Sequence, residues 1–402
     1  MKLLKTRALT PLMVALCALP AQAENASDSI FSLSGFATLG LVGTDTNDAQ
    51  YAGNGQMRGA DKTWSGEVDS KLGVQVSAKF SSMFSATVQL LSKQNGDGNF
   101  TPGLEWAFVK AQVNPNLSVR VGRMGGPFFA VSDFRDVGYA NTWVRPPLDV
   151  YGQVPFSSFD GADLNYQMPT SLGTWSAQLF GGQGKTVVAG TDVDLKKMLG
   201  FNTTLEMDNG LSLRFGHLSG RLTAHTTNLA ALVATIRKTP FTSTADELDP
   251  TDKKATFTGL GAVWDSGDWL VSSEYTQRRT DSYAADTNAW YVTVGHRMGK
   301  FLPYATVSEL KHVDSNVVNV IKPLTPGLAQ LSAAVDGFVA TQYRSQKTWA
   351  MGVRWDAMRN VAVKAQFDRV KPTGPGSFIN VQPGFGSGSS VNVYSIAVDT
   401  VF

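Results

Sequence analysis

Apolar and polar residues alternate along short segments that recur through most of the chain. In residues 66–80 the apolar side chains from Val68 to Val76 fall on one side of an extended backbone, and lysine, glutamine and serine fall on the other. Successive side chains of a strand point to opposite faces, so this alternation predicts β-strands with one apolar and one polar face. Residues 393–402 repeat the pattern and end on Phe402.

About sixteen such segments are found, and the connectors between them alternate strictly between short and long. The predicted strands are residues 32–43, 66–80, 84–93, 104–113, 117–123, 161–168, 173–182, 197–207, 211–220, 256–264, 269–278, 289–298, 301–310, 347–357, 361–370 and 393–402. The short connectors carry Gly, Asn, Asp and Pro, which favour tight turns. The long connectors are 44–65, 94–103, 124–160, 183–196, 221–255, 279–288, 311–346 and 371–390. Short turns at one end and long loops at the other are typical of an up-and-down barrel.

The sidedness of these segments predicts the surrounding medium. Strands of about 9–11 residues match a tilted transmembrane strand. Charged residues avoid the apolar parity, as expected if that parity faces lipid, where a mid-depth Arg costs ~2–4 kcal/mol. We therefore expect the other parity to line the lumen, with these wall residues: Lys71, Arg120, Glu206, Arg214, Glu274, Arg354 and Lys364.

Aromatic residues near strand ends suit the interfacial belts of a membrane barrel. They are Phe84, Trp106, Trp175, Trp264, Trp269, Trp290, Trp349, Trp355 and Tyr394. The segment 104–113 does not fit, because Trp106 and Phe108 share a parity with Lys110. Its facing stays open, and Lys110 could place its ammonium at an interface.

The fold predicted from these patterns is all-β, a transmembrane antiparallel up-and-down barrel of about 16 strands. An open sheet would leave unpaired backbone groups in hydrocarbon, whereas closure avoids this. The last strand must then pair with the first, residues 32–43, and Phe402 should face lipid at the end of this seam.

Residues 1–23 have the features of a secretory signal peptide, with Lys2, Lys5 and Arg7 before a short apolar run and a small-residue AQA site. The run is too short to span a membrane as a helix. Residues 24–402 are then the barrel. The single cysteine, Cys17, lies in the leader, where the preceding Leu16 argues against lipidation.

Composition narrows the possible functions further. The 35 Lys and Arg residues nearly balance the 33 Asp and Glu residues, and the leader holds three of the basic ones. Nucleic-acid binding therefore has no electrostatic support. His217, His225, His296 and His312 show no paired ligand spacing, so we expect neither a metal nor another cofactor. The run GGQGKT at 181–186 lacks the first glycine of a phosphate loop, because Leu179 occupies that position. Residues 228–236 could form a short helix in a loop.

The longest aromatic-rich connector, residues 123–159, begins with a Gly-Gly-Pro hinge and is too apolar for a simple surface loop. If this third long loop folds inward, its aromatic residues (Phe128, Phe129, Tyr139 and Trp143) could contact the wall. Its charged residues could then narrow the pore: Asp133, Arg135, Asp136, Arg145 and Asp149. Alternatively, these charges could pair with one another away from the permeation path.

The leader, the alternating strands, the third-loop text "WVRPPLDVYGQVPFSSFDGADL" and the final Phe resemble those of Gram-negative outer-membrane porins. The resemblance covers essentially the whole chain after the leader. It implies a water-filled channel that the third loop constricts, usually in a homotrimer surrounded by outer-membrane lipid and lipopolysaccharide. It also implies that Phe402 is part of the signal read by the barrel-assembly machinery. The chain lacks the short acidic third-loop motif and wall-arginine run of general diffusion porins, so ion selectivity does not carry over.

The sequence thus predicts an outer-membrane porin, not an enzyme, for passive diffusion of small hydrophilic solutes or ions. A channel that prefers phosphate, sugars or organic acids is the alternative. Two further alternatives are a barrel hydrolase that uses His296 and an adhesin role for the long loops.

Overall fold

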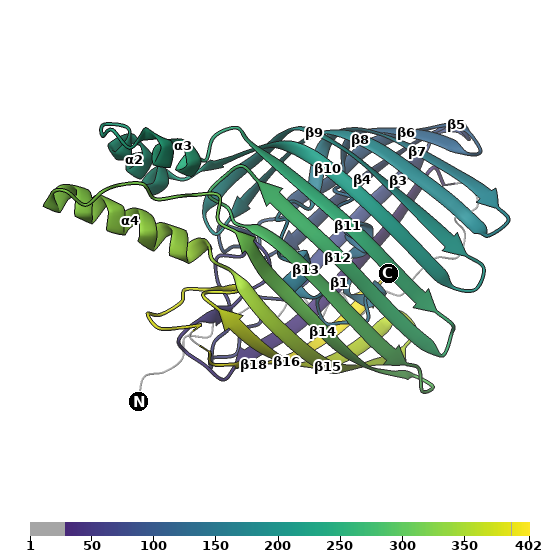
Figure 1. Ribbon diagram of the computed structural model, residues 1–402. Helices are drawn as coiled ribbons and strands as arrows, with labels where there is room; N and C mark the ends of the chain where they lie inside the picture. Colours follow the sequence, from purple (N-terminus) through teal and green to yellow (C-terminus); the bar gives the residue numbers. More distant parts are fainter. Residues whose placement is uncertain (1–28, 387) are drawn as a thin grey trace.

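The computed structural model describes residues 29–386 and 388–402, so the predicted leader lies outside the described residues. Within these ranges, sixteen antiparallel strands close into one barrel, as the sequence predicts (Figure 1). In chain order they are β1 (Phe31–Thr44), β3 (Lys71–Lys79), β4 (Phe84–Lys93), β5 (Gly103–Asn114), β6 (Leu117–Gly125), β7 (Ser158–Thr170), β8 (Gly173–Val188), β9 (Thr191–Met207), β10 (Leu211–His225), β11 (Lys253–Asp265), β12 (Trp269–Thr280), β13 (Asp286–His296), β14 (Phe301–Asp314), β15 (Ser345–Met358), β16 (Val361–Thr373) and β18 (Val391–Val401).

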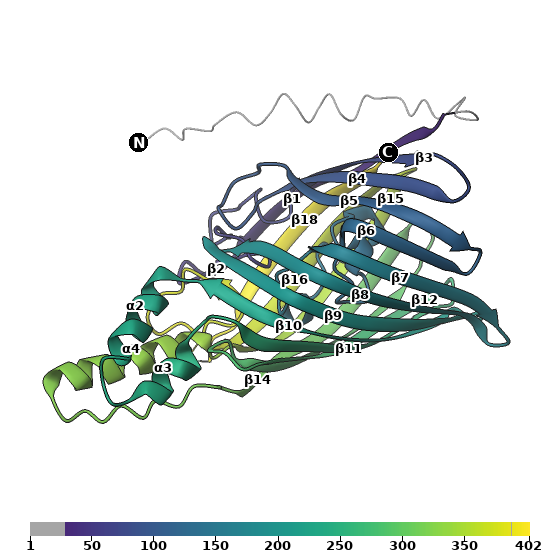
Figure 2. The same cartoon turned by 90° about the horizontal axis from the view of Figure 1, so that it is seen from above.

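The remaining elements lie in the long loops. A two-stranded sheet joins β2 (Gln50–Tyr51) to β17 (Phe378–Ile379). The helices are η2 (Ser132–Phe134), η3 (Gly138–Ala140), α1 (Leu148–Tyr151), α2 (Thr227–Ile236), α3 (Thr242–Leu248) and α4 (Pro326–Gln342). The helix expected at 228–236 is therefore present as α2. Helices α2, α3 and α4 extend beyond the barrel at the end opposite the tight turns (Figures 1 and 2). In the described residues, no helix is long and apolar enough to cross a membrane.

The barrel closes between its first and last strands. Strand β1 pairs antiparallel with β18, with Leu39 opposite Val398. The ladder continues to Phe402, whose N–H donates to the Gly35 carbonyl at 3.0 Å and whose carbonyl accepts from Gly35 N–H at 2.8 Å. The Phe402 side chain is 42% exposed and shares the parity of the exposed Ile396 and Val398. The seam and the outward facing of Phe402 are thus as the sequence predicts.

The outer face is apolar where the alternation predicts it. Large apolar side chains exposed on the outer parity include Val76, Val88, Val121, Leu179, Leu260, Val307, Met351 and Ile396. Aromatic side chains stand among them near the tight turns, such as Trp264, Trp269, Phe301 and Trp355. A second group, including Tyr275, Trp349 and Tyr394, lies farther along the strands. Two groups of exposed aromatic residues, one near each end of the strands, are typical of the two aromatic belts of a membrane barrel.

Three local expectations were wrong. Residues 183–196 do not form a long loop, because β8 and β9 extend as a hairpin that turns at Ala189 and Gly190, both with positive φ. Strand β3 starts only at Lys71. Val68 is therefore buried rather than exposed to lipid, in a cluster of loop and strand residues that includes Tyr51 and Val42.

The third error concerns Trp106 of β5, which the sequence predicts in an outer aromatic belt, while it leaves the facing of the strand itself open. A register shift between Gln89 and Leu90 on β4 leaves an extra residue on β5, so the parity changes along that strand. Val109 and Val113 are exposed on the outside, and Phe108 packs against the cluster of buried residues in the lumen. Trp106 and Lys110 share the parity of Phe108, so Trp106 belongs to no outer belt and Lys110 does not reach an interface.

The facing of the strands can be tested by moving a charge between the two parities. We expect Val398→Arg to abolish outer-membrane assembly, because it places a guanidinium in the apolar band at ~2–4 kcal/mol. Gln75→Arg should assemble, because Gln75 faces the lumen, where it accepts from Gln89. The heat-modifiable electrophoretic mobility of the porin in the membrane fraction measures the assembly of both variants. Equal yields from the two variants would contradict the assigned facing.

Candidate functional site: a loop folded into the barrel lumen

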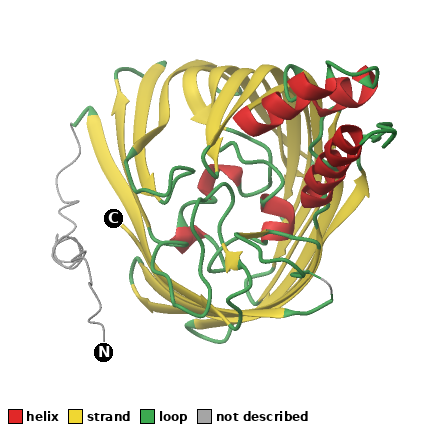
Figure 3. Cartoon of the chain, turned by 90° about the vertical axis from the view of Figure 1, so that its left-hand side faces the viewer, coloured by secondary structure: helices red, strands yellow, loops and turns green. Residues whose placement is uncertain are grey.

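The third long loop, residues 126–157, enters the barrel and occupies part of its interior (Figure 3). It leaves β6 and first reaches the far wall, where Arg214 of β10 donates to the Pro127 carbonyl at 2.6 Å. It then returns to the side of β3 and β4, since Asp136 contacts Lys93 at 2.9 Å. Residues 131–137 therefore cross the lumen between two opposite walls.

Apolar packing holds the loop against one wall. Phe129 lies 4.5 Å from Tyr151 and 5.2 Å from Phe257 of β11, between ring centroids. Trp143 meets Tyr291 of β13 edge-on at 5.6 Å. All five side chains are buried, so this cluster is a hydrophobic core inside the lumen. Each buried aromatic of this kind stabilises the seated loop by about 1.5–3 kcal/mol.

Buried charges on the wall bind the loop backbone. Glu274 accepts from Ala130 N–H at 3.0 Å and from the Tyr151 hydroxyl at 2.6 Å. Lys364 donates to the carbonyls of Gly138 and Trp143 at 2.7 and 2.9 Å. These two predicted wall residues therefore hold the loop in place and do not face open water.

The loop backbone can approach the wall this closely only because residue 138 is a glycine. A Cβ there would collide with the carboxylate of Asp399, which pairs with Lys364 at 2.9 Å, and with the Thr38 hydroxyl. Arg354 of β15 continues the row of contacts by donating to the Tyr139 and Asn141 carbonyls at 2.6 and 3.0 Å.

Arg145 of the loop contacts two buried carboxylates, Asp69 and Asp368. Its guanidinium bonds Asp69 at 2.9 and 2.6 Å and the Ser395 hydroxyl at 2.6 Å, and it lies 3.5 Å from Asp368. Burial alone would lower the pKa of Arg145, but the charge and hydrogen bonds of Asp69 outweigh burial and raise it. Arg145 thus joins three separate parts of the molecule: the first loop, the third loop and the wall strands β16 and β18.

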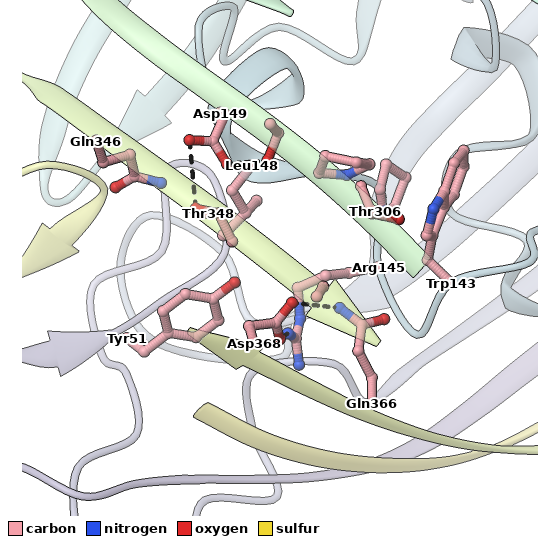
Figure 4. A pocket seen from close by; sticks show the side chains of 14 residues that line it. Tyr51, Trp143, Arg145, Leu148, Asp149, Thr306, Gln346, Thr348, Gln366 and Asp368 are labelled. Atoms are coloured by element: carbon pink, nitrogen blue, oxygen red, sulfur yellow. Dashed lines mark hydrogen bonds and ion pairs between the residues drawn. The ribbon is translucent and has the colours of Figure 1, made fainter. Parts of the chain in front are cut away.

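Asp149 lies beside a small enclosed cavity between the loop and the wall (Figure 4). It accepts from the Ser308 hydroxyl at 2.8 Å and more weakly from Thr348 at 3.4 Å. Burial raises the pKa of Asp149 to about 6, and these hydrogen bonds only partly offset the effect. Arg145 and Asp149 are predicted from the sequence to narrow the pore, but both are buried between the loop and the barrel wall.

The crossing segment carries the more accessible charges. Asp136 contacts Lys93 at 2.9 Å, Lys71 at 3.7 Å and Arg135 at 3.8 Å. Burial would raise the pKa of Asp136, but the charges of these three cations, Lys93 foremost, hold it well below its usual value. Asp133 is exposed nearby.

The wall opposite the crossing segment is polar and includes β6 to β9. Arg120 pairs with Asp163 on β7, with Nε 3.0 Å from Oδ1, and its guanidinium lies 5.3 Å from the Phe108 ring. Gln178 also donates to Asp163, at 2.7 Å. Glu206 has the lumen parity but lies near the tight-turn end of β9, away from the loop. In the ranges 29–386 and 388–402, no group of acidic residues and histidines could hold a metal ion.

A closed sixteen-stranded barrel with an apolar exterior and a loop folded into a polar lumen defines a membrane channel. A family model described as Gram-negative porin matches residues 8–315, which is most of the sequence. The chain belongs to this family: it is an outer-membrane porin that forms a channel. No curated protein matches its sequence.

Solved structures show the same fold at low sequence identity. The outer membrane channel DcaP of Acinetobacter baumannii is 11% identical with a TM-score of 0.56, over 92% of this chain and 97% of that one. The anion-selective porin from Comamonas acidovorans is 13% identical with a TM-score of 0.52, over 92% and 99%. The trimer form of OmpT from Vibrio cholerae is 12% identical with a TM-score of 0.53, over 92% and 99%.

Sequence reasoning did not identify the residues that pair with the predicted loop and wall charges. These are Asp69, Lys93, Asp163, Asp368 and Asp399. All five lie on the polar parity of predicted strands, so the parity rule could have identified them as lumen-facing, although the structure places Asp69 in the first long loop, just before β3. Which of them meets which loop residue depends on the path of the loop, and no local pattern shows that path.

The anchoring role of Arg145 yields a test. We expect Arg145→Met to cost about 3–5 kcal/mol, because it leaves the buried carboxylates of Asp69 and Asp368 without a counter-charge. The loop should then sit less firmly, giving a larger and noisier single-channel current. Thermal unfolding in detergent and planar-bilayer recordings measure the two effects.

The matched control is Arg58→Met, because the Arg58–Glu67 pair is exposed, and such pairs contribute about 0–1 kcal/mol. If both variants unfold at the same temperature and conduct alike, Arg145 does not anchor the loop.

Proposed function

We propose that this porin passes small hydrophilic solutes and ions by diffusion, through a constriction between residues 131–137 and the opposite wall. The observation that carries the proposal is the crossing segment, which divides the lumen while the rest of the loop is held against the wall. Asp133, Arg135 and Asp136 would form its loop side. Arg120 would form its opposite wall side, and Lys71 and Lys93, which pair with Asp136, would lie at the end of the crossing segment on β3 and β4. Charges of both signs across a narrow passage select solutes by size and charge.

The proposed constriction predicts a change in ion selectivity. Replacing Asp133 and Asp136 together by Asn removes two negative charges and leaves the facing cations unpaired, so permeability should shift toward anions. The reversal potential in a KCl gradient across a planar bilayer measures this shift.

A matched control is Asp208→Asn with Asp268→Asn, which removes the same charge from exposed tight turns. The control should leave the reversal potential unchanged. A potential equally unchanged in the Asp133 and Asp136 variant would remove both residues from the constriction.

We propose no enzymatic activity, and the position of His296 supports this. Its ring stacks against Trp269 at 4.4 Å on the outer face of the barrel, and Arg297 beside it pairs with Asp265. These contacts are those of an interfacial aromatic belt. They offer no nucleophile for the hydrolase alternative.

We also propose that three copies of the chain associate through the outer face of β5 to β7. The ion pair between Arg123 and Asp160, at 2.7 Å, has the same parity as the exposed Val121 and Leu164. Charged groups facing lipid are costly, whereas a neighbouring protomer could cover them. The trimer form of the Vibrio cholerae protein OmpT, which shares the fold, is in keeping with this proposal.

The trimer proposal can be tested by steric block. Val121→Trp should prevent close contact at this face and reduce the cross-linked trimer in mild detergent. Val292→Trp adds the same bulk to β13, on another part of the outer face, and should leave the trimer intact. Retention of trimers in both variants would place the interface elsewhere.

The remaining partners are proposals that extend the family assignment. Residues 1–23 would direct export, and outer-membrane lipid and lipopolysaccharide would surround the barrel. The barrel-assembly machinery would read the last strand with Phe402, whose ring stands exposed beside Gly35 at the seam.

A further inference from the structure

Two arginines lie at the long-loop end of the barrel, Arg278 near the end of β12 and Arg344 just before β15. Arg278 of β12 lies opposite Thr287 of β13, and Thr287 lies opposite His312 of β14. The His312 N–H donates to the Ser345 hydroxyl at 2.9 Å, at the start of β15. Arg344 directly precedes Ser345, so the two arginines lie at one level of the wall.

Arg278 forms no ion pair with a carboxylate of the described residues, although Asp286 lies within electrostatic range. Its terminal nitrogens donate to the carbonyls of Gln153 at 3.0 Å and Ala285 at 2.8 Å. Its Nε has no hydrogen-bond partner, and no acidic side chain of the described residues forms an ion pair with it. The bond to Gln153 places this cation directly beside the third loop, where solutes would approach the constriction.

Arg344 is exposed and is free of hydrogen bonds and ion pairs to any described residue. Its charge lies within electrostatic range of Arg278 and of the Tyr283 hydroxyl. The neighbouring Tyr343 ring stacks on His312 at 4.4 Å, which supports the backbone next to Arg344. The positive charges of Arg278 and Arg344 repel each other, and neither forms an ion pair with an acidic residue in the described ranges. An anion between them would therefore be stabilised.

The acidic groups near this pair do not cancel its charge. Asp286 accepts from Thr280 N–H at 2.8 Å and from Asn316 at 3.1 Å, and it lies 3.7 Å from Arg279. Asp314 is exposed at the end of β14. Asp286 is thus already engaged by Arg279 of the outer parity, and Asp314 is the other carboxylate near Arg278 and Arg344.

We propose that Arg344 and Arg278 form a binding site for the oxyanion group of small carboxylate or phosphate solutes at the extracellular mouth of the channel. The planar guanidinium of Arg344 can donate two parallel hydrogen bonds to such a group, and Arg278 adds a second positive charge. The site collects anionic solutes before they reach the constriction. This inference rests on the proposed diffusion function.

The test is current block in planar bilayers. Succinate or inorganic phosphate is added in turn to each side of the membrane, and the half-blocking concentration is measured in KCl. The unmodified porin should be blocked by both anions from the long-loop side. Arg344→Gln should raise the half-blocking concentration about tenfold, because a charged hydrogen-bonded partner is lost. Arg344→Lys should give a smaller rise, since the charge remains without the planar fork.

The matched control is Arg369→Gln, which removes one exposed cation from the outer face of β16, opposite the outward-facing Trp349. It should keep the half-blocking concentration of the unmodified porin. A normal KCl conductance with no block by either anion, or equal block in Arg344→Gln and Arg369→Gln, would overturn the site and leave the channel function intact. Absence of any KCl conductance in the unmodified protein would overturn the channel function and this site with it.

Discussion

The constraint on which this structure depends is that every backbone group in the apolar band must find a partner within the protein. Strand β1 pairs with β18, and the ladder runs to Gly35 and Phe402, so the sheet has no free edge in this band. A closed sheet of this size has a wide interior. The same closure that satisfies the backbone thus creates a space that water alone would fill.

The third loop converts that space into a narrower passage. Its core of buried aromatic residues supplies free energy, and its buried polar contacts fix its position. The two kinds of contact have different consequences. Apolar contacts tolerate small shifts, whereas Glu274 and Lys364 of the wall bond specific loop atoms, and Arg145 of the loop bonds Asp69 and Ser395. Because a buried charge without its partner is costly, these charged residues specify one seating of the loop.

Charge is distributed unevenly between the seated and crossing parts of the loop. The buried charges, such as Arg145, hold the loop, and the more accessible ones, such as Asp133, would meet the solute on the proposed path. On the proposed path, a solute from outside meets the pair Arg278 and Arg344 first and the mixed charges near Asp136 next. Anions would be concentrated at the mouth, while the constriction would discriminate by size and field.

The sequence alone determined the barrel, its sixteen strands and the facing of nearly every residue on them, because alternation is a local property with a period of two. It failed at β5, where one extra residue changes the parity, and at β8 and β9, whose hairpin extends beyond the apolar band. For the site, the sequence identified the inward-folding loop and wall residues such as Lys71 and Arg120. Only the tertiary structure decided that Arg145 and Asp149 are buried anchors and that Arg344 stands near Arg278. Contacts between residues far apart in the chain depend on the path of the loops, and no local period encodes that path.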